Sequence, residues 1–465
     1  MDKKQRELYL ENMLKGRTVA LLGIGVSNLP LIDFLLERGA IVCARDMKAR
    51  ERLGGELADS LENKGVRLVC GESYLDSITE DIIFRSPGIR FDKPTLSDAV
   101  KRGALLTSEM QLFFDISPAH MIGVTGSDGK STTTTVISKI LECDKKHTFL
   151  GGNIGFPLLS RVDEMSSDSY CAVELSSFQL HTMNRSPEVS VITNVTPNHL
   201  DYHTDMDEYT NAKANVLKYQ SEDSTAVLNY ENPITRELAK KAKGRVVLFS
   251  SKTVPDCDNR VYEKDGMIFY NDEAIIVSSD IRIPGRHNVE NYMAAIGALY
   301  GRVSTDSIRQ VAREFSGVAH RCQLVRELRG VRYYNSSIDS SPTRTAAALS
   351  NFDRKVIVLC GGYDKNIPFE PLAEPLCNKS KAVILCGATK EKIKKALVES
   401  KCYKNAAEPP EIYETEDLGR SVELASEIAK EGDVVLLSPA CASFDAFKNF
   451  EERGFFFVDK VNSLK

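Results

Sequence analysis

The stretch "GVTGSDGKSTTTTVISKIL", residues 123–141, decides the fold class because its glycine-rich turn joins an apolar strand to a helix. The run "MIGV" predicts the strand, and the apolar spacing from residue 136 to residue 141 predicts the buried face of the helix. Gly126 and Gly129 let the backbone approach a phosphate, and the amides of a helix start point toward an anion. The stretch therefore predicts a nucleotide-binding loop in an α/β protein.

The glycine spacing of this turn departs from the usual phosphate loop. The usual pattern has a Gly five residues before the Gly-Lys pair, and here Val124 occupies that position. Lys130 can still reach the terminal phosphates, and Ser131 or Thr132 can hold Mg²⁺. The alternative is a polar turn that only caps a helix. A Gly-x-x-Gly-Lys-Ser-Thr run between strand and helix argues against that alternative.

Strands and helices alternate along the whole chain. The strands "RTVALLGIG" and "AIVCARD" flank the helical run "LPLIDFLLERG", a second set starts at "HMIGVTGSDGK", and a third follows "SGVAHR". Continuous apolar strands of this kind are buried on both faces, which predicts mostly parallel, Rossmann-like sheets. We predict three domains with boundaries near residues 107 and 317, covering 1–107, 108–317 and 318–465. Ligands should bind outside the carboxyl ends of the strands.

Composition excludes several classes of partner. The 465 residues carry a net charge of −5, so neither a nucleic acid nor a membrane surface is expected to bind. No apolar run approaches the length of a membrane span, and the charged start "MDKKQRELYLENMLKGR" does not resemble a secretory signal. The 11 Cys include no C-x-x-C pair, and most lie in apolar strands, which indicates reduced thiols in a cytoplasmic protein.

The form T-G-x-x-G-K-S-T resembles the phosphate loop of the Mur ligase family, which also includes folylpolyglutamate synthetases. Further blocks of that family occur in order along nearly the whole chain: "GGNIG", "VELSSFQL", "NVTPNHLDYH", "YTNAKANVL", "GRHNVENYMAA", "GVAHR" and "LLSPACASFDAFKNFEERG". The blocks "ELSSFQL" and "SPACASFDAFKNFEERG" resemble in particular the members that add D-glutamate. The resemblance implies a Rossmann-like N-terminal domain, a central P-loop ATPase-type domain and a Rossmann-like C-terminal domain.

The resemblance also implies a reaction of peptidoglycan synthesis. ATP would phosphorylate the carboxylate of UDP-N-acetylmuramoyl-L-alanine, and the amine of D-glutamate would displace the phosphate to form an amide. This chemistry needs phosphoryl clamps, metal ions and a docked amine. The implied cofactors are ATP and a pair of Mg²⁺ ions, the partners are small molecules, and a monomer is expected.

The resemblance assigns catalytic roles to Lys130, Glu174, His199 and Lys213. Glu174 ends a predicted strand and His199 follows one, so each would otherwise be read as a solvated or structural residue. With Ser131 they are implied metal ligands. Lys213 is implied to take up CO₂ as a carbamate, although a Lys on such a helix is ordinarily solvated. The implied ATP-binding residues are Gly126, Ser127, Asp128, Gly129, Lys130, Ser131, Thr132, Asn288, Asn291, Arg321 and Ser336.

The first domain carries Gly23-x-Gly25, but Asn28 stands where a dinucleotide fingerprint has its third Gly. Because Asp46 follows the glycine pair by about twenty residues, NAD binding is the physical alternative. The resemblance favours the UDP end of the substrate instead. The implied residues for the UDP-linked substrate are Val26, Ser27, Asp46, Gly88, Asn153 and Ser176. The implied residues for D-glutamate, in the third domain, are Ser340, Lys365, Ser443, Phe444 and Phe450, the last through its backbone amide.

One block departs from the family pattern. Where these ligases have N-D-S-x-A-[TS], this chain reads "NSSIDSS", so Ser336 replaces the Asp that holds the ATP ribose and Asp339 replaces an Ala. A hydroxyl binds a ribose more weakly than a carboxylate. We expect that Asp339 does not supply the missing contact. Two other functions stay open: another amino-acid ligase of the family, or a non-catalytic UDP-sugar or nucleotide sensor, against which the intact catalytic residues argue.

Overall fold

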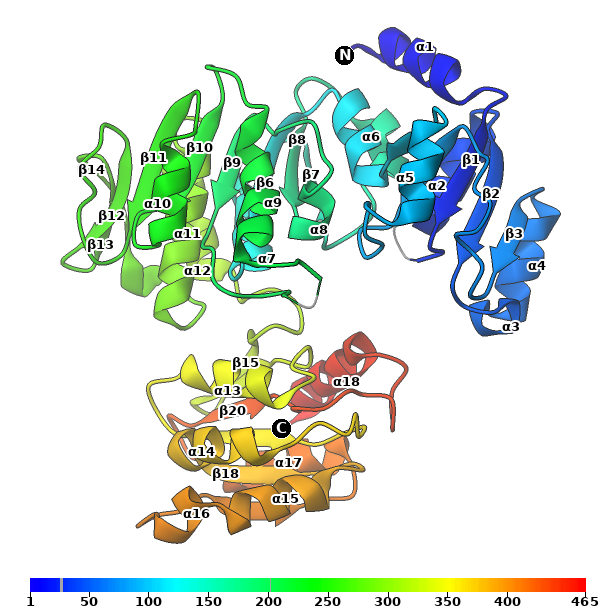
Figure 1. The fold of residues 1–465 in the computed structure, drawn as a ribbon. Helices are drawn as coiled ribbons and strands as arrows, with labels where there is room; N and C mark the ends of the chain where they lie inside the picture. The colour runs from blue at the N-terminus through cyan, green and yellow to red at the C-terminus, as the bar shows by residue number, and fades with distance from the viewer. Residues whose placement is uncertain (26–27, 201) are drawn as a thin grey trace. The chain divides into compact units, whose positions relative to one another are not determined.

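The N-terminal sheet is parallel throughout. The computed structural model describes residues 1–25, 28–200 and 202–465 (Figure 1), so Val26 and Ser27 lie outside the described residues. The strand order is β3-β2-β1-β4-β5. The strands are β1 (Thr18–Leu22), β2 (Ile41–Asp46), β3 (Arg67–Cys70), β4 (Ile82–Arg85) and β5 (Leu105–Thr107). The helices are α1 (Lys3–Leu14), α2 (Asn28–Glu37), α3 (Arg50–Leu53), α4 (Gly55–Asn63), α5 (Pro94–Lys101) and α6 (Glu109–Ile116).

The central sheet has nine strands in the order β14-β13-β12-β11-β10-β9-β6-β8-β7. Its phosphate-loop strand β6 lies between β9 and β8, and the last strands, β12 to β14, pair antiparallel at one edge. The strands are β6 (His120–Thr125), β7 (Thr148–Gly152), β8 (Tyr170–Glu174), β9 (Val189–Ile192), β10 (Thr225–Asn229), β11 (Arg245–Ser250), β12 (Arg260–Lys264), β13 (Met267–Tyr270) and β14 (Glu273–Val277). The helices are α7 (Lys130–Cys143), α8 (Ser177–Leu180), α9 (Met206–Lys218), α10 (Pro233–Ala239), α11 (Arg286–Leu299) and α12 (Thr305–Glu314), with short 3₁₀ turns η1 (Leu159–Glu164) and η2 (Ser278–Asp280).

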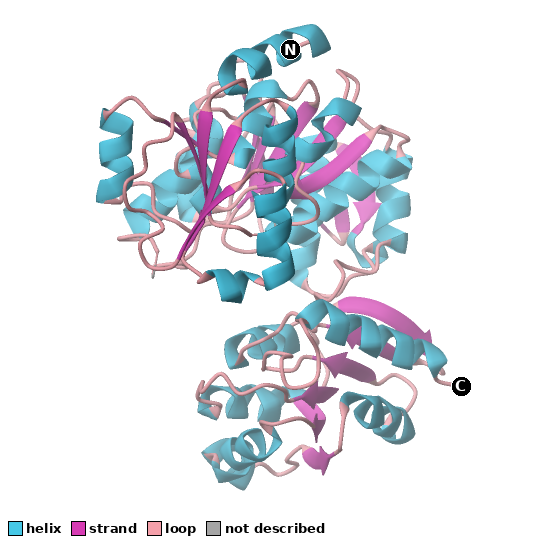
Figure 2. Ribbon diagram, turned by 90° about the vertical axis from the view of Figure 1, so that its right-hand side faces the viewer, coloured by secondary structure: helices cyan, strands magenta, loops and turns pink. Residues whose placement is uncertain are grey.

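The C-terminal sheet has six strands in the order β15-β16-β20-β17-β18-β19 and carries helices on both faces (Figure 2). Only β15 runs antiparallel to its neighbour. The strands are β15 (Gln323–Leu328), β16 (Val331–Asn335), β17 (Val356–Cys360), β18 (Ser380–Leu385), β19 (Glu411–Glu414) and β20 (Val434–Leu437). The helices are α13 (Pro342–Ser350), α14 (Glu370–Lys379), α15 (Lys390–Glu399), α16 (Lys401–Asn405), α17 (Leu418–Ile428) and α18 (Phe450–Ser463).

The chain forms two compact units. Unit 1 comprises residues 1–278 and 290–311, and unit 2 comprises residues 279–289 and 312–465. A single hydrophobic cluster runs through both sheets of unit 1, where it includes Phe34, Phe113 and Tyr209. Its continuity supports contact between the first two sheets, because shared apolar burial is the main stabilising term. Among the described residues, no helix has the length and apolar character of a membrane span.

Alternation of side chains explains the burial on both faces of the C-terminal sheet. In β17, Val358 packs into one hydrophobic cluster, while Ile357 and Leu359 pack into another on the opposite face. Successive residues of a strand point to opposite faces, so an uninterrupted apolar run fills both layers. This is the arrangement that the apolar run "KVIVLCGG" predicts.

Candidate active site

The phosphate loop between β6 and α7 depends on two glycines. Gly126 has φ of 149° and Gly129 has φ of 81°, in the region that L side chains rarely adopt. A Cβ at position 126 would collide with Oγ1 of Thr193, and a Cβ at position 129 would collide with Oδ1 of Asn291. A side chain at either place would therefore strain this path of the loop.

The segment after β9 holds the phosphate loop from one side. The amides of Ser127 and Asp128 donate to the carbonyl and the side-chain oxygen of Asn194, both at 2.9 Å. Thr193 Oγ1 donates to the Asp128 carbonyl at 2.5 Å, and Ser127 Oγ donates to the Thr196 carbonyl at 2.9 Å. The sequence did not predict these roles for Thr193 and Asn194, although Asn194 begins the quoted block "NVTPNHLDYH" and Thr193 directly precedes it. These bonds keep the loop in place for an anion.

Lys130 begins α7 and lies against the loop that it follows. Its Nζ donates to the carbonyls of Gly126 and Ser127, each at 2.9 Å. Ser131 is buried and Thr132 is half-buried in the first turn of α7. A helix N-terminus that presents amides and an ammonium group together provides a site for phosphate.

Lys213 lies inside the protein, on α9, rather than in solvent. Only 1% of its surface is exposed, and its Nζ donates to the Gly126 carbonyl at 2.6 Å. Burial, and to a lesser degree the charge of Lys130, lowers the pKa of Lys213 to about 6. At neutral pH a large share of the amine is therefore neutral, which is the form that reacts with CO₂.

Glu174, at the end of β8, offers an oxygen for a cation. The carboxylate is buried, and its Oε1 accepts a hydrogen bond from Asn153 Nδ2 at 3.0 Å. Its Oε2 is buried without a hydrogen-bond partner among the described residues. A buried carboxylate oxygen without a donor is costly, so the position fits a Mg²⁺ ion. Ser176, two residues on, caps α8 by accepting from the Gln179 amide at 3.2 Å.

His199 lies on the exposed loop that follows β9 and has φ of 54°. Its ring centroid is 5.0 Å from that of Phe178 and 6.5 Å from that of Tyr209. The Tyr209 hydroxyl is 3.0 Å from Ser127 Oγ in the phosphate loop. Ser131, Glu174, His199 and Lys213 remain the predicted metal ligands.

A second group of metal-type side chains lies nearby. His181, His203 and Glu208 present atoms within 4.8 Å of one another, and none of the three is among the predicted metal ligands. Both oxygens of Glu208 already accept hydrogen bonds from Arg90, at 2.9 and 3.2 Å, and Oε2 also accepts from the Thr204 amide at 2.6 Å. The Arg90 hydrogen bonds lower the pKa of Glu208 to about 2. We therefore interpret this group as an ion pair rather than a metal site.

Two of the predicted UDP-binding residues, Asp46 and Gly88, lie at the carboxyl ends of β2 and β4, the two neighbours of β1. Asp46 is buried, and its two oxygens accept from the amides of Ile24 and Lys48 at 2.7 and 2.8 Å. Its carboxylate therefore shapes the loop. Asn28 Nδ2 donates to the Gly23 carbonyl at 2.8 Å, a contact that a glycine could not make. Gly88 lies in the turn after β4, where the Ile89 amide donates to the Ser86 carbonyl at 3.0 Å.

The block "NSSIDSS" in unit 2 is largely buried. Ser336 Oγ accepts from the Cys322 amide at 3.1 Å, so this hydroxyl already has a partner within its own domain. Asp339 accepts from Ser438 Oγ at 2.8 Å, and burial raises the pKa of Asp339 to about 6. Ser340 is half-buried. The departure from the family pattern thus places a satisfied carboxyl group in the interior.

Four of the predicted D-glutamate residues lie on loops at the carboxyl ends of β16, β17 and β20, which are neighbours in the sheet, and the fifth, Phe450, begins α18. Ser337 Oγ donates to the Phe450 carbonyl at 2.8 Å, and the Tyr363 amide donates to the Ala442 carbonyl at 2.9 Å. These bonds connect the loops. Lys365 and Phe444 are exposed, whereas Ser443 is buried.

Two of the predicted ATP-binding residues, Asn288 and Arg321, belong to unit 2. Asn288, in the first turn of α11, donates through Nδ2 to the Pro284 carbonyl at 2.6 Å. Arg321 is exposed, and its amide donates to the Val318 carbonyl at 3.0 Å. Asn291, later on α11, belongs to unit 1 and contacts Thr133 Oγ1 at 3.2 Å.

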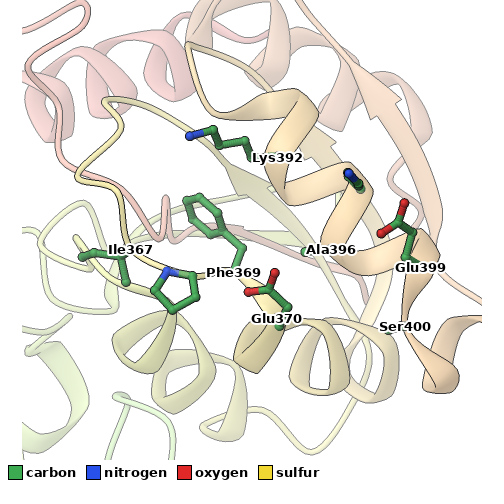
Figure 3. Close-up of a pocket in the computed structure, with 9 residues that line it drawn as sticks. Ile367, Phe369, Glu370, Lys392, Ala396, Glu399 and Ser400 are labelled. Carbon is green, nitrogen blue, oxygen red and sulfur yellow. The ribbon is translucent and has the colours of Figure 1, made fainter.

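A cavity of about 430 Å³ in unit 2 lies between α15 and the end of the loop after β17, the loop that also carries Lys365 (Figure 3). None of the five predicted D-glutamate residues lines it. Its charged residues have both signs, so it favours neither an anion nor a cation. It is lined by Ile367, Pro368, Phe369, Glu370, Lys392, Lys395, Ala396, Glu399 and Ser400.

Phosphate-loop geometry beside a buried carboxylate and a buried amine defines an α/β enzyme that handles nucleotides. Three family models cover most of the chain: "Mur ligase MurD-like, N-terminal domain" at residues 17–108, "Mur ligase middle domain" at 124–299, and "Mur ligase, glutamate ligase domain" at 320–441. The chain belongs to the Mur ligase family.

Sequence comparison shows which members of that family this chain is similar to. The chain is 49% identical to a UDP-N-acetylmuramoylalanine–D-glutamate ligase of Clostridium perfringens, over 98% of each chain. It is 47% identical to the ligase of the same name from Acetivibrio thermocellus, over 97% of each chain. The crystal structure of UDP-N-acetylmuramate-alanine ligase MurC from Thermotoga maritima matches with a TM-score of 0.58 and 20% identity, covering 97% of this chain and 100% of that one. That last match shows the shared fold.

Proposed function

We propose that this Mur ligase joins D-glutamate to UDP-N-acetylmuramoyl-L-alanine with ATP, as a cytoplasmic monomer in peptidoglycan synthesis. The observation that carries the substrates is the 47–49% identity, over nearly the whole chain, to ligases of that name. The observation that supports the chemistry is the buried Lys213 amine beside the phosphate loop, together with the Glu174 oxygen that has no hydrogen-bond partner among the described residues.

Phosphoryl transfer would occur at the start of α7. A carboxylate oxygen of the substrate attacks the γ-phosphorus, and the bond from that phosphorus to the β-γ bridging oxygen breaks, leaving ADP and an acyl phosphate. The α7 amides and Lys130 stabilise the charge on the transferring group. Lys130 must leave the carbonyls of Gly126 and Ser127 to do so. Mg²⁺, when bound, neutralises phosphate charge.

Lys213 would complete the metal site after reacting with CO₂. The neutral amine nitrogen forms a bond to the carbon of CO₂, and the nitrogen loses a proton to solvent, which leaves a carbamate anion. Burial favours the neutral amine that this step requires. An anionic oxygen at this position would join Ser131, Glu174 and His199 as the ligand set.

The C-terminal domain would deliver the amino acid. The neutral amine of D-glutamate attacks the acyl carbon, phosphate leaves, and the nitrogen loses its extra proton as the amide forms. Lys365, Ser340, Ser443, Phe444 and the Phe450 amide would hold the carboxylates. At the other end of the substrate, Asp46, Gly88, Asn153 and Ser176 would shape the binding surface.

Phosphate release provides the test. The purified chain is incubated with ATP, Mg²⁺ and UDP-N-acetylmuramoyl-L-alanine, and D-glutamate is compared with L-glutamate, L-alanine and meso-diaminopimelate. We expect release only with D-glutamate, and near-zero release from a folded Lys130→Ala variant. Equal release with another amino acid would overturn the substrate, and normal release by Lys130→Ala would overturn the assignment of the loop.

A further inference from the structure

Arg90 crosses from the N-terminal domain to the central domain immediately after the turn that contains Gly88. Its Nη1 donates to the Tyr202 carbonyl at 2.6 Å, and its two terminal nitrogens bond the two oxygens of Glu208 at 2.9 and 3.2 Å. Asp92, on its own side, accepts two further hydrogen bonds at 2.7 and 3.0 Å. A guanidinium bonded in this way holds two segments in a fixed geometry, because its donors form a rigid fork.

The segment that Arg90 holds is the loop that carries His199. The amides of Tyr202 and His203 both donate to the His199 carbonyl, at 3.1 and 3.0 Å. A displacement of the Tyr202 backbone would therefore move His199. At its other end the loop is attached to the phosphate loop, where Ser127 Oγ and the Thr196 backbone exchange two hydrogen bonds of 2.9 Å.

The turn before Arg90 also accepts a hydrogen bond from the loop that contains His199, whereas Arg90 donates hydrogen bonds to that loop. The Tyr202 hydroxyl donates to the Pro87 carbonyl at 3.0 Å. Arg85, which is almost fully buried, donates to that same carbonyl at 3.0 Å and to Thr182 Oγ1 of the central domain at 3.1 Å. The turn that contains Gly88 and the loop that contains His199 are thus connected by hydrogen bonds from both sides.

We propose that Arg90 is a positioning residue, which fixes the His199 loop against the turn predicted to bind the UDP-linked substrate. The inference rests on the proposed function, since that function makes His199 a metal ligand and Gly88 a substrate contact. The competing explanation is that Arg90 only attaches one domain to the other. Residues behind a metal ligand set its orientation, and their loss costs about 10- to 100-fold in metal affinity or activity.

Asp163 provides a matched control for this explanation. It pairs with Arg6 at 3.0 Å and Arg38 at 2.9 Å, so it also joins the N-terminal domain to the central domain. It lies in η1, outside the His199 loop and outside the predicted active site. Asp163→Asn therefore weakens the same domain contact without touching the loop.

The test compares Arg90→Ala, Arg90→Lys and Asp163→Asn in the full chain. Mn²⁺ affinity in the presence of a non-hydrolysable ATP analogue is measured by electron paramagnetic resonance, and kcat, the KM for the UDP-linked substrate and the melting temperature are measured beside it. We expect Arg90→Ala to weaken Mn²⁺ binding about 10-fold or more, with a lower kcat. Asp163→Asn should change the melting temperature alone. Arg90→Lys should recover part of the Mn²⁺ affinity.

A double-mutant cycle isolates the contact with Glu208. We expect Arg90→Ala and Glu208→Gln to be non-additive in Mn²⁺ affinity, because each removes the same interaction. If Arg90→Ala and Asp163→Asn change the melting temperature alike and neither changes Mn²⁺ affinity or kcat, Arg90 is only a domain attachment and the proposal fails. Mn²⁺ affinity is measured without turnover, so it does not depend on which amino acid the enzyme uses. If the wild-type chain used another amino acid, the proposed function would be refuted, but the Mn²⁺ affinities of the Arg90 and Asp163 variants would still decide the role of Arg90.

Discussion

Two buried ionisable side chains, one in each compact unit, have similar pKa values and different surroundings. Burial lowers the pKa of Lys213 to about 6 and raises the pKa of Asp339 to about 6. Asp339 accepts from Ser438, which also bonds Thr345 at 2.9 Å. The charge of Glu174 acts on Lys213, and within the described part of the chain one oxygen of that carboxylate has no hydrogen-bond partner.

The difference teaches that burial alone does not mark a catalytic group. A buried ionisable group whose neighbours satisfy it contributes to the interior of its domain, as Asp339 does. A buried group beside unsatisfied polar atoms is arranged for a further ligand. Lys213 is of the second kind, which supports its proposed role as a carbamate.

Replacement of Lys213 should have the largest effect. We expect Lys213→Ala to lower kcat by about a hundredfold to a thousandfold, the magnitude seen when one group that stabilises transition-state charge is lost. A small carboxylate such as acetate should restore part of the activity by occupying the place of the carbamate. Lys218→Ala, an exposed Lys on the same helix, is the control and should be unaffected. Full activity in Lys213→Ala would show that Lys213, like Asp339, is a buried group without a catalytic role.

Lys365 tests whether unit 2 uses an exposed cation rather than its buried carboxyl group to bind substrate. Loss of a charge-assisted contact of about 1.5–3 kcal/mol should raise the KM for D-glutamate in Lys365→Ala by about 10- to 100-fold. The KM for ATP should stay unchanged. The control is Lys395→Ala, since Lys395 lines the cavity of Figure 3. If Lys395→Ala raises the KM for D-glutamate instead, that cavity is the amino-acid site.

The two buried groups should respond to pH in opposite directions. Between about pH 6 and about pH 10 the unfolded chain binds a proton at Lys213 that the folded chain lacks, so its contribution to the free energy of unfolding rises with pH. Between about pH 4 and about pH 6 the folded chain holds a proton at Asp339 that the unfolded chain lacks, so this contribution falls with pH.

Variants separate these two windows. Wild type should gain stability relative to Lys213→Met between pH 7 and pH 9, and should lose stability relative to Asp339→Asn between pH 4 and pH 6. Urea denaturation at each pH measures the differences. If the two variants showed the same pH dependence, or none, the buried groups would not have the shifted pKa values that the comparison assumes.

The smallest effect is expected at the departure from the family pattern. Ser336→Asp restores the carboxylate that would hold the ATP ribose, and a charged hydrogen bond is roughly twice as strong as a neutral one, so we expect a few-fold tighter ATP binding. Asp339→Ala should leave ATP binding unchanged, because its carboxylate is engaged by Ser438. A large loss of ATP affinity in Asp339→Ala, measured by isothermal titration calorimetry, would instead mean that Asp339 compensates for Ser336.

Local patterns predicted the parts of the molecule that are local in sequence. The strand-turn-helix around Lys130 and the apolar strands of all three sheets follow from periodicity and glycine placement. The contact between Asn291 and Gly129, and that between Arg90 and Glu208, join residues more than a hundred positions apart. Periodicity carries no information about such pairs, so only the fold reveals them.

The pairing order of the central sheet has a consequence for how this enzyme tolerates mutation. The phosphate loop, Glu174 and the Thr193–Thr196 segment leave the carboxyl ends of β6, β8 and β9, which are direct neighbours. Backbone hydrogen bonding sets neighbouring strands about 4.8 Å apart whatever side chains they carry. Substitutions in a covering helix that carries none of the proposed catalytic residues, such as α10, should therefore reduce the folded fraction before they alter the spacing of the reacting groups. As such substitutions accumulate, the amount of folded protein should fall first, and the specific activity of the molecules that still fold should fall last.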